Sequence, residues 1–65
     1  MTIIRNAIRC NRCGDEIESL TDHDFKTCSC GTCAVDGGKA YLKRLAPSKD
    51  SFTELALTID EGDDL

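Results

Sequence analysis

Apolar residues alternate with polar ones along most of this chain, which is the pattern of short, half-buried β-strands. In residues 2–9 the side chains of Ile4, Asn6 and Ile8 share one predicted face, and the residues between them share the other. Ile17 is flanked by two glutamates and predicts the returning strand of a hairpin. A further short strand is expected at residues 25–27, and the chain is therefore predicted to be mainly β.

Two later segments carry specific signals for local structure. Gly37-Gly38 separates two short apolar runs, and a Gly-Gly pair predicts a two-residue hairpin turn because both turn positions need a positive φ. In residues 51–60 the motif from Ser51 to Glu54 fits a helix capping box, whereas Leu57 and Ile59 alternate with polar residues. The alternation and the threonines favour a strand. We expect a single domain over residues 1–60 and a frayed acidic tail over 61–65.

The chain has 65 residues and three aromatic side chains, so its apolar core is too small to stabilise a fold alone. Its five cysteines are the obvious reinforcement: Cys10, Cys13, Cys28, Cys30 and Cys33. The N-terminal residues do not resemble a signal peptide, and no stretch is apolar enough to span a membrane. We therefore expect reduced thiols in a cytoplasmic protein, and metal ligands rather than disulfides.

Two cysteine pairs on separate turns can supply the four donors that tetrahedral zinc requires. A template of two Cys-x-x-Cys pairs would select Cys30 and Cys33 for the second pair. Turn chemistry favours Cys28 and Cys30 instead, because glycine follows Cys30 as it follows Cys13. Cys33 shares an alternating face with Val35 and can act as a small buried apolar residue. The preferred set is one structural zinc on Cys10, Cys13, Cys28 and Cys30, with the Cys33 variant as the alternative.

Other ligands and metals fit the sequence less well. His23 is the only histidine, but it lies in a polar loop, and a surface position or an orienting hydrogen bond near the metal is expected for it. Iron can occupy four thiolates too. Zinc is preferred because the chain has few aromatic side chains to shield a redox-active iron.

Several motifs together resemble those of one family of small proteins that is common in bacteriophages and in prophage regions of bacterial genomes. They are Cys-Asn-Arg-Cys-Gly at 10–14, the run from His23 through Cys-Ser-Cys-Gly at 28–31, and Val-Asp-Gly-Gly at 35–38. The resemblance spans residues 3–45. It implies a zinc-ribbon-like domain in the cytoplasm of a bacterial host, and it supports Cys28 and Cys30 as the second ligand pair. It implies no particular activity.

Catalysis is not expected, because four cysteines close the coordination sphere that a catalytic zinc keeps open. Nucleic-acid binding is disfavoured by a net charge of −4, which four metal-bound thiolates make more negative. It remains the alternative function, as a transcription-associated accessory protein using Arg9, Arg12 and Lys43-Arg44. The leading interpretation is a protein-interaction module that binds or inhibits a host protein, with the acidic stretch 15–24 meeting a basic surface. The sequence carries no signal for an oligomeric state.

Overall fold

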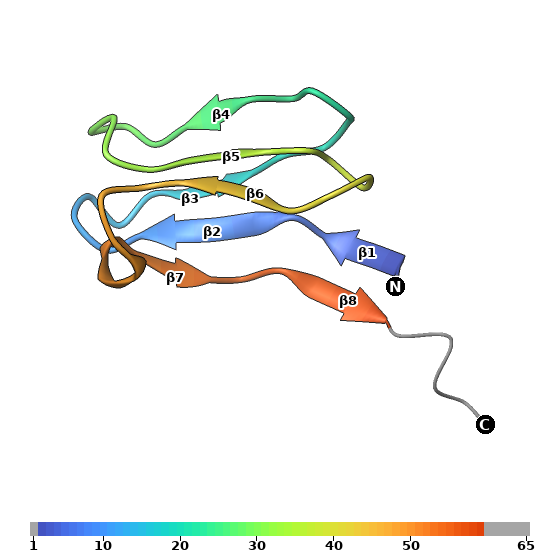
Figure 1. The fold of residues 1–65 in the computed structure, drawn as a ribbon. Helices are drawn as coiled ribbons and strands as arrows, with labels where there is room; N and C mark the ends of the chain where they lie inside the picture. Colours follow the sequence, from blue (N-terminus) through green and yellow to red (C-terminus); the bar gives the residue numbers. More distant parts are fainter. Residues whose placement is uncertain (1, 60–65) are drawn as a thin grey trace.

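The computed structural model describes residues 2–59, which form short strands linked by turns and one turn of 3₁₀ helix (Figure 1). The elements are β1 (Thr2–Arg5), β2 (Ala7–Cys10), β3 (Glu16–Glu18), β4 (Lys26–Thr27), β5 (Ala34–Asp36), β6 (Lys43–Leu45), η1 (Lys49–Ser51), β7 (Phe52–Glu54) and β8 (Leu57–Ile59). The predicted fold class, a small and mainly β domain built from antiparallel hairpins, is confirmed.

The strands form two three-stranded antiparallel sheets and a two-stranded ribbon. One sheet has the order β3-β2-β7, the other β4-β5-β6, and the ribbon pairs β1 with β8. The turns β2–β3 and β4–β5 lie at one end of the molecule, together with η1 (Figure 1). We call this the cysteine end. The opposite end, which holds the β3–β4 and β5–β6 connections and the β1–β8 ribbon, is the loop end.

The core between the sheets is very small. Ile8 from β2 and Val35 from β5 are fully buried, and three cysteines complete the buried cluster. Ile17 and Phe52 pack against its edge while remaining partly exposed. Burying so few large apolar side chains yields little stabilisation from the core itself.

The first predicted strand is interrupted, and this changes which residues face inward. The register between β1 and β8 shifts between Ile3 and Arg5, which marks a β-bulge. Ile3 is buried, whereas Ile4 is 45% exposed. The expectation that Ile4 shares a face with Ile8 is therefore wrong, because one extra residue inverts the alternation on one side of the bulge.

Gly37-Gly38 does not form the predicted two-residue hairpin. Strand β5 ends before this pair and β6 begins at Lys43, so the connection is longer. Within it the N–H groups of Ala40 and Tyr41 both donate to the carbonyl of Gly37. Side chains would not fit at either glycine, because a Cβ would collide with Tyr41 at Gly37 and with the backbone of Thr21 at Gly38. The pair serves close packing between loops as well as turning.

Buried polar side chains close the loop end. Asn6 is fully buried, and its Nδ2 donates to the carbonyls of Asp36 (3.1 Å), Gly38 (2.9 Å) and Tyr41 (3.1 Å). Its Oδ1 accepts from Nη1 of Arg44 at 2.6 Å. Buried Ser19 acts similarly, donating to the carbonyl of Asp24 (2.7 Å) and accepting from the N–H of Gly38 (2.9 Å).

Residues 51–59 adopt the predicted strands rather than a helix. β7 pairs with β2, and β8 pairs with β1, so this segment lines one edge of the molecule (Figure 1). The capping-box residue Ser51 ends the 3₁₀ turn instead of starting an α-helix. The expected tail at 61–65 lies outside the described residues. Within residues 2–59, no helix is long and apolar enough to cross a membrane.

Candidate metal centre

Four cysteine sulfurs converge at the cysteine end. Cys10 ends β2 and Cys13 lies in the turn after it, whereas Cys28 and Cys30 lie in the turn after β4. Their Sγ atoms all lie within 4.8 Å of one another. Cys10 and Cys28 each place their sulfur 3.6 Å from that of Cys30. All five cysteines are free thiols.

These separations fit a metal ion. A tetrahedron with zinc–sulfur bonds of about 2.3 Å has sulfur–sulfur edges of about 3.8 Å, whereas a disulfide bond is about 2.05 Å long. The observed 3.6 Å is close to the tetrahedral edge. Four thiols gathered in this way could therefore hold one metal ion.

The two cysteine turns both end in a glycine that directly follows the second cysteine. Gly14 and Gly31 both have a positive φ, 79° and 77°, which glycine adopts at no steric cost. The N–H of Gly14 donates to the carbonyl of Cys10 at 2.8 Å, and the N–H of Gly31 donates to that of Cys28 at 3.0 Å. This repeated glycine is the feature that favoured Cys28 and Cys30 as the second ligand pair.

The four sulfurs divide by exposure. Cys10 and Cys28 are buried, whereas Cys13 and Cys30 are exposed. Cys30 is hydrogen-bonded to the hydroxyl of Thr32 at 3.1 Å, and together with the backbone N–H of Thr32 this lowers the pKa of Cys30 to about 6. Cys30 is therefore mostly a thiolate at neutral pH, which is the form that binds metal.

The pKa values of the other three thiols are shifted by opposing effects. The N–H of Cys13 lowers the pKa of Cys10, but burial and the neighbouring thiols outweigh it, and the net shift is upward. The N–H groups of Asp15 and Cys30 lower the pKa of Cys13, but burial and the neighbouring thiols outweigh them, and its net shift is upward as well. Burial raises the pKa of Cys28, but the N–H of Cys33, 3.3 Å from its sulfur, helps to bring it below the ordinary value.

Cys33 lies outside the group of four. Its side chain is 1% exposed and belongs to the core with Val35, as its alternating position predicted. Burial raises its pKa, so it is a neutral thiol at pH 7. It donates weakly to the carbonyl of Ser51 at 3.4 Å. Its backbone, however, serves the site through the hydrogen bond to Cys28.

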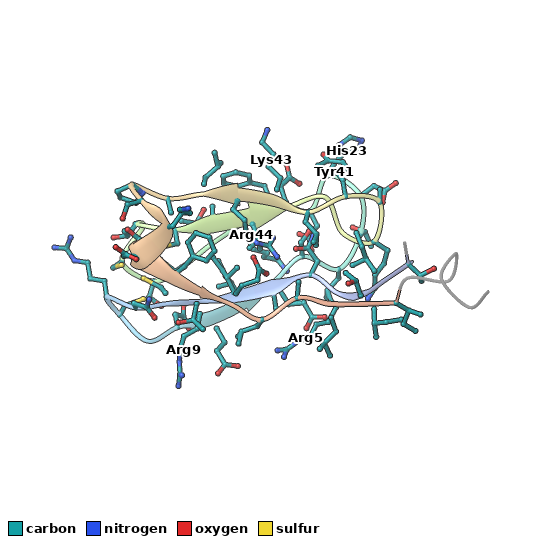
Figure 2. The ribbon with its side chains drawn as sticks, turned by 60° about the horizontal axis from the view of Figure 1, so that its bottom comes forward. Arg5, Arg9, His23, Tyr41, Lys43 and Arg44 are labelled. Carbon is teal, nitrogen blue, oxygen red and sulfur yellow. The ribbon has the colours of Figure 1, made fainter. Side chains whose placement is uncertain are left out.

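His23 is exposed, has a positive φ of 66°, and lies toward the opposite end of the molecule from the sulfurs (Figure 2). Of the two positions expected for it, the structure therefore has the surface one. It does not belong to the cysteine group found among residues 2–59.

Three polar residues in or beside the cysteine motifs contact the site and were not predicted: Asp15, Ser29 and Thr32. Thr32 bonds Cys30, as described above. Asp15 accepts two hydrogen bonds from Ser29 through its Oδ2, one from the N–H at 3.0 Å and one from the hydroxyl at 2.7 Å. Their positions, two residues after Cys13 and between Cys28 and Cys30, were the only available signal.

A small, mainly β fold with four cysteines gathered on two glycine-containing turns defines the class of zinc-ribbon-like metal-binding domains. Residues 2–46 match the family model of a domain of unknown function, DUF7695, and the chain belongs to this family. Neither the curated proteins nor the solved structures include a match to the chain.

Proposed function

We propose that this chain is a zinc-stabilised protein-interaction module that binds a protein of a bacterial host, as the product of a phage or prophage gene. The observation that carries the metal part is the convergence of four thiols within 4.8 Å in a domain with almost no apolar core. Zinc fits because it prefers four thiolates in a tetrahedron. Iron is the competing ion, and the sparse aromatic shielding disfavours it.

The role of the metal is structural in this proposal. A closed set of four cysteine ligands leaves no position for water or substrate, so no catalytic step is assigned to the ion. The ion joins the β2–β3 turn to the β4–β5 turn, and its binding free energy becomes folding free energy. All five cysteines then have a use, four as ligands and Cys33 as core.

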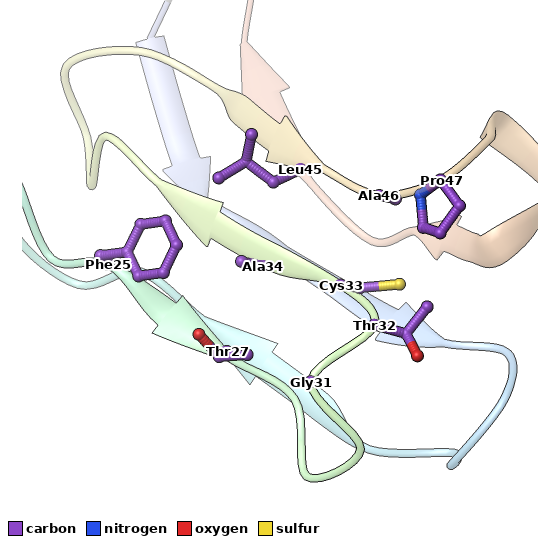
Figure 3. Close-up of a pocket in the computed structure, with 9 residues that line it drawn as sticks. All are labelled: Phe25, Thr27, Gly31, Thr32, Cys33, Ala34, Leu45, Ala46 and Pro47. Carbon is purple, nitrogen blue, oxygen red and sulfur yellow. The ribbon is translucent and has the colours of Figure 1, made fainter.

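A hollow apolar surface supports binding to a protein. Thr27, Ala34 and Leu45 are direct cross-strand partners and share the outer face of the β4-β5-β6 sheet. A pocket of about 400 Å³ lies over them, between the ring of Phe25 and Pro47 (Figure 3). Phe25 is 53% exposed and Leu45 44%. An apolar side chain of a partner protein matches this lining.

The arrangement of the cations weakens the nucleic-acid alternative. Arg44 does not point outward, because it pairs with both carboxylate oxygens of Glu54 (2.6 and 2.9 Å) and with Asn6. Arg9 and Lys43 lie on opposite sides of the molecule (Figure 2). A phosphate backbone needs several cations along one face, and these do not form one.

The acidic stretch 15–24 is a weaker docking candidate than its sequence suggests. Glu16 and Glu18 approach the guanidinium of Arg5 at 3.9 and 3.7 Å. The N–H of Leu20 donates to the carboxylate of Asp24, and together with Lys26 at 3.2 Å it lowers the pKa of Asp24. Because these acids are already paired, we assign the partner to the apolar face.

The metal part is tested by native mass spectrometry and cobalt substitution. One zinc per chain is expected, and cobalt should give the intense charge-transfer absorption of four thiolates. A chain that is cooperatively folded with no metal bound would overturn the metal assignment. If iron is bound instead of zinc, the assignment of the four ligands stands and only the identity of the ion changes.

The partner part is tested by affinity capture from host lysate, followed by direct binding of the purified captured protein. Phe25→Ser and Leu45→Ser should each abolish binding. Leu57→Ser is the matched control, since Leu57 is 56% exposed on β8 at the other end of the molecule. Recovery of DNA or RNA that depends on Arg9 and Arg12 and weakens steeply with salt would contradict the proposal.

A further inference from the structure

The two cysteine turns belong to different sheets, so a metal site requires that something fix their separation. The turn after β2 holds Cys10 and Cys13, and the turn after β4 holds Cys28 and Cys30. The backbone bonds that shape each turn, from Gly14 and from Gly31, stay within that turn. These bonds define the shape of each loop but not the distance between the loops.

Asp15 connects the two turns. Its carbonyl accepts from the N–H of Cys10 at 2.8 Å, which ties it to the first turn. Its Oδ2 accepts from both the N–H and the hydroxyl of Ser29, which lies between the two cysteines of the second turn. One residue thus holds both loops through three hydrogen bonds, and two of these bonds have a carboxylate acceptor, which strengthens them.

The charge of Asp15 makes this position unexpected on electrostatic grounds. Four thiolates around a divalent ion carry a net charge of −2, and another anion nearby repels that centre. A carboxylate two residues from a ligand is therefore unfavourable for the metal unless its geometry compensates. The two bonds to Ser29 provide such compensation.

We propose that Asp15 and Ser29 are positioning residues for the metal, which preset the separation of the cysteine turns and so raise metal affinity and slow metal release. This inference rests on the proposed metal site. Hydrogen-bonding partners around the ligands of a metal site typically change affinity by about 10- to 100-fold when they are removed. Because Ser29 is exposed, we expect the lower end of that range.

The test compares Asp15→Ala, Asp15→Asn, Ser29→Ala and a control, Glu16→Ala, in zinc competition against a chromophoric chelator and in the rate of zinc transfer to it. Asp15→Ala should weaken binding and speed release about 10-fold. Ser29→Ala keeps its N–H and should have a smaller effect. Asp15→Asn keeps an acceptor oxygen and should restore most of the affinity, and Glu16→Ala should behave as the unchanged chain.

The cobalt spectrum separates positioning from general stability. Asp15→Ala should retain the thiolate charge-transfer intensity while its d–d bands shift, and Glu16→Ala should show no shift. Equal or tighter zinc binding by Asp15→Ala would overturn the positioning role of Asp15 and Ser29, since the repulsion between the Asp15 carboxylate and the thiolates would then dominate. If Asp15→Ala fails to fold, Asp15→Asn and Ser29→Ala decide by the same measurements. Absence of zinc binding in the unchanged chain would instead refute the metal site itself.

Discussion

Distant segments of the chain are brought together at both ends of this molecule, but by different side chains. At the loop end, buried Asn6 and Ser19 join distant segments with hydrogen bonds that the chain supplies itself. At the cysteine end, four thiols gather, and two of them are buried. Buried polar groups are stabilising only when they are satisfied. The loop end satisfies its buried polar groups within the chain, whereas the cysteine end gathers four sulfurs that could hold a metal ion.

Of the changes that test this comparison, metal removal should have the largest effect on the folded structure. Structural zinc sites contribute about 10–16 kcal/mol of apparent binding free energy, far more than the few core residues can replace. Chelation at neutral pH should abolish the β-sheet circular dichroism signal, and zinc should restore it. Unchanged amide hydrogen exchange at the cysteine end after chelation would remove the distinction between the ends.

Asn6→Ala is the corresponding break at the loop end. It removes four hydrogen bonds of a fully buried side chain and leaves three carbonyls and Arg44 without this partner. We expect a loss of about 2–4 kcal/mol in the denaturation of the zinc-loaded protein. Zinc stoichiometry should stay at one. Asn11→Ala, which removes two exposed hydrogen bonds, is the control and should cost less.

Cys33→Ala distinguishes core from ligand within the second motif. It removes a buried sulfur and should destabilise the zinc-loaded protein by about 1 kcal/mol without altering the cobalt spectrum. Cys28→Ala, its matched partner in burial, should lose the four-thiolate spectrum. The reverse result would mean that Cys33 completes the site and that the repeated-glycine argument fails.

Thr32→Val should give the smallest change, a shift in acid-induced zinc release. A pKa of about 6 keeps Cys30 ionised at neutral pH, and this advantage disappears as the pH falls through that value. Removing the hydroxyl raises the pKa of Cys30 toward the ordinary value for a thiol, so protons compete with zinc at higher pH. The release midpoint, read with a zinc dye, should rise by about half a pH unit. Thr27→Val should leave it unchanged.

Much of the local structure was predictable because its determinants are close in sequence. Glu16–Glu18 alternates and returns as a strand, and residues 57–59 alternate and pair with β1. The glycines after Cys13 and Cys30 indicated two turns that each end in a positive φ, and the four sulfurs do lie together. Burial of Cys33 followed from its place beside Val35.

The features that the sequence did not predict are determined by residues far away in the chain. The bulge in β1 arises in its pairing with β8, more than fifty residues later, and nothing near Ile4 signals it. The connection at Gly37-Gly38 is held by Asn6 and packed against Thr21, so local turn preference does not decide its length. Arg44 appears in the sequence as a free cation, and only the fold brings Asn6 and Glu54 to it.

Strand β7 has a consequence for where this protein can be divided. The family match ends at residue 46, yet Phe52–Glu54 supplies the hydrogen-bonded neighbour of β2, and the carbonyl of Ser51 accepts from the N–H of Asn11 at 2.9 Å. A chain ended at residue 46 would leave the backbone of β2 as an open edge beside the first cysteine turn. The segment that the family model covers is therefore shorter than the segment whose strands pair in the fold, and a shortened chain should keep residues 47–59.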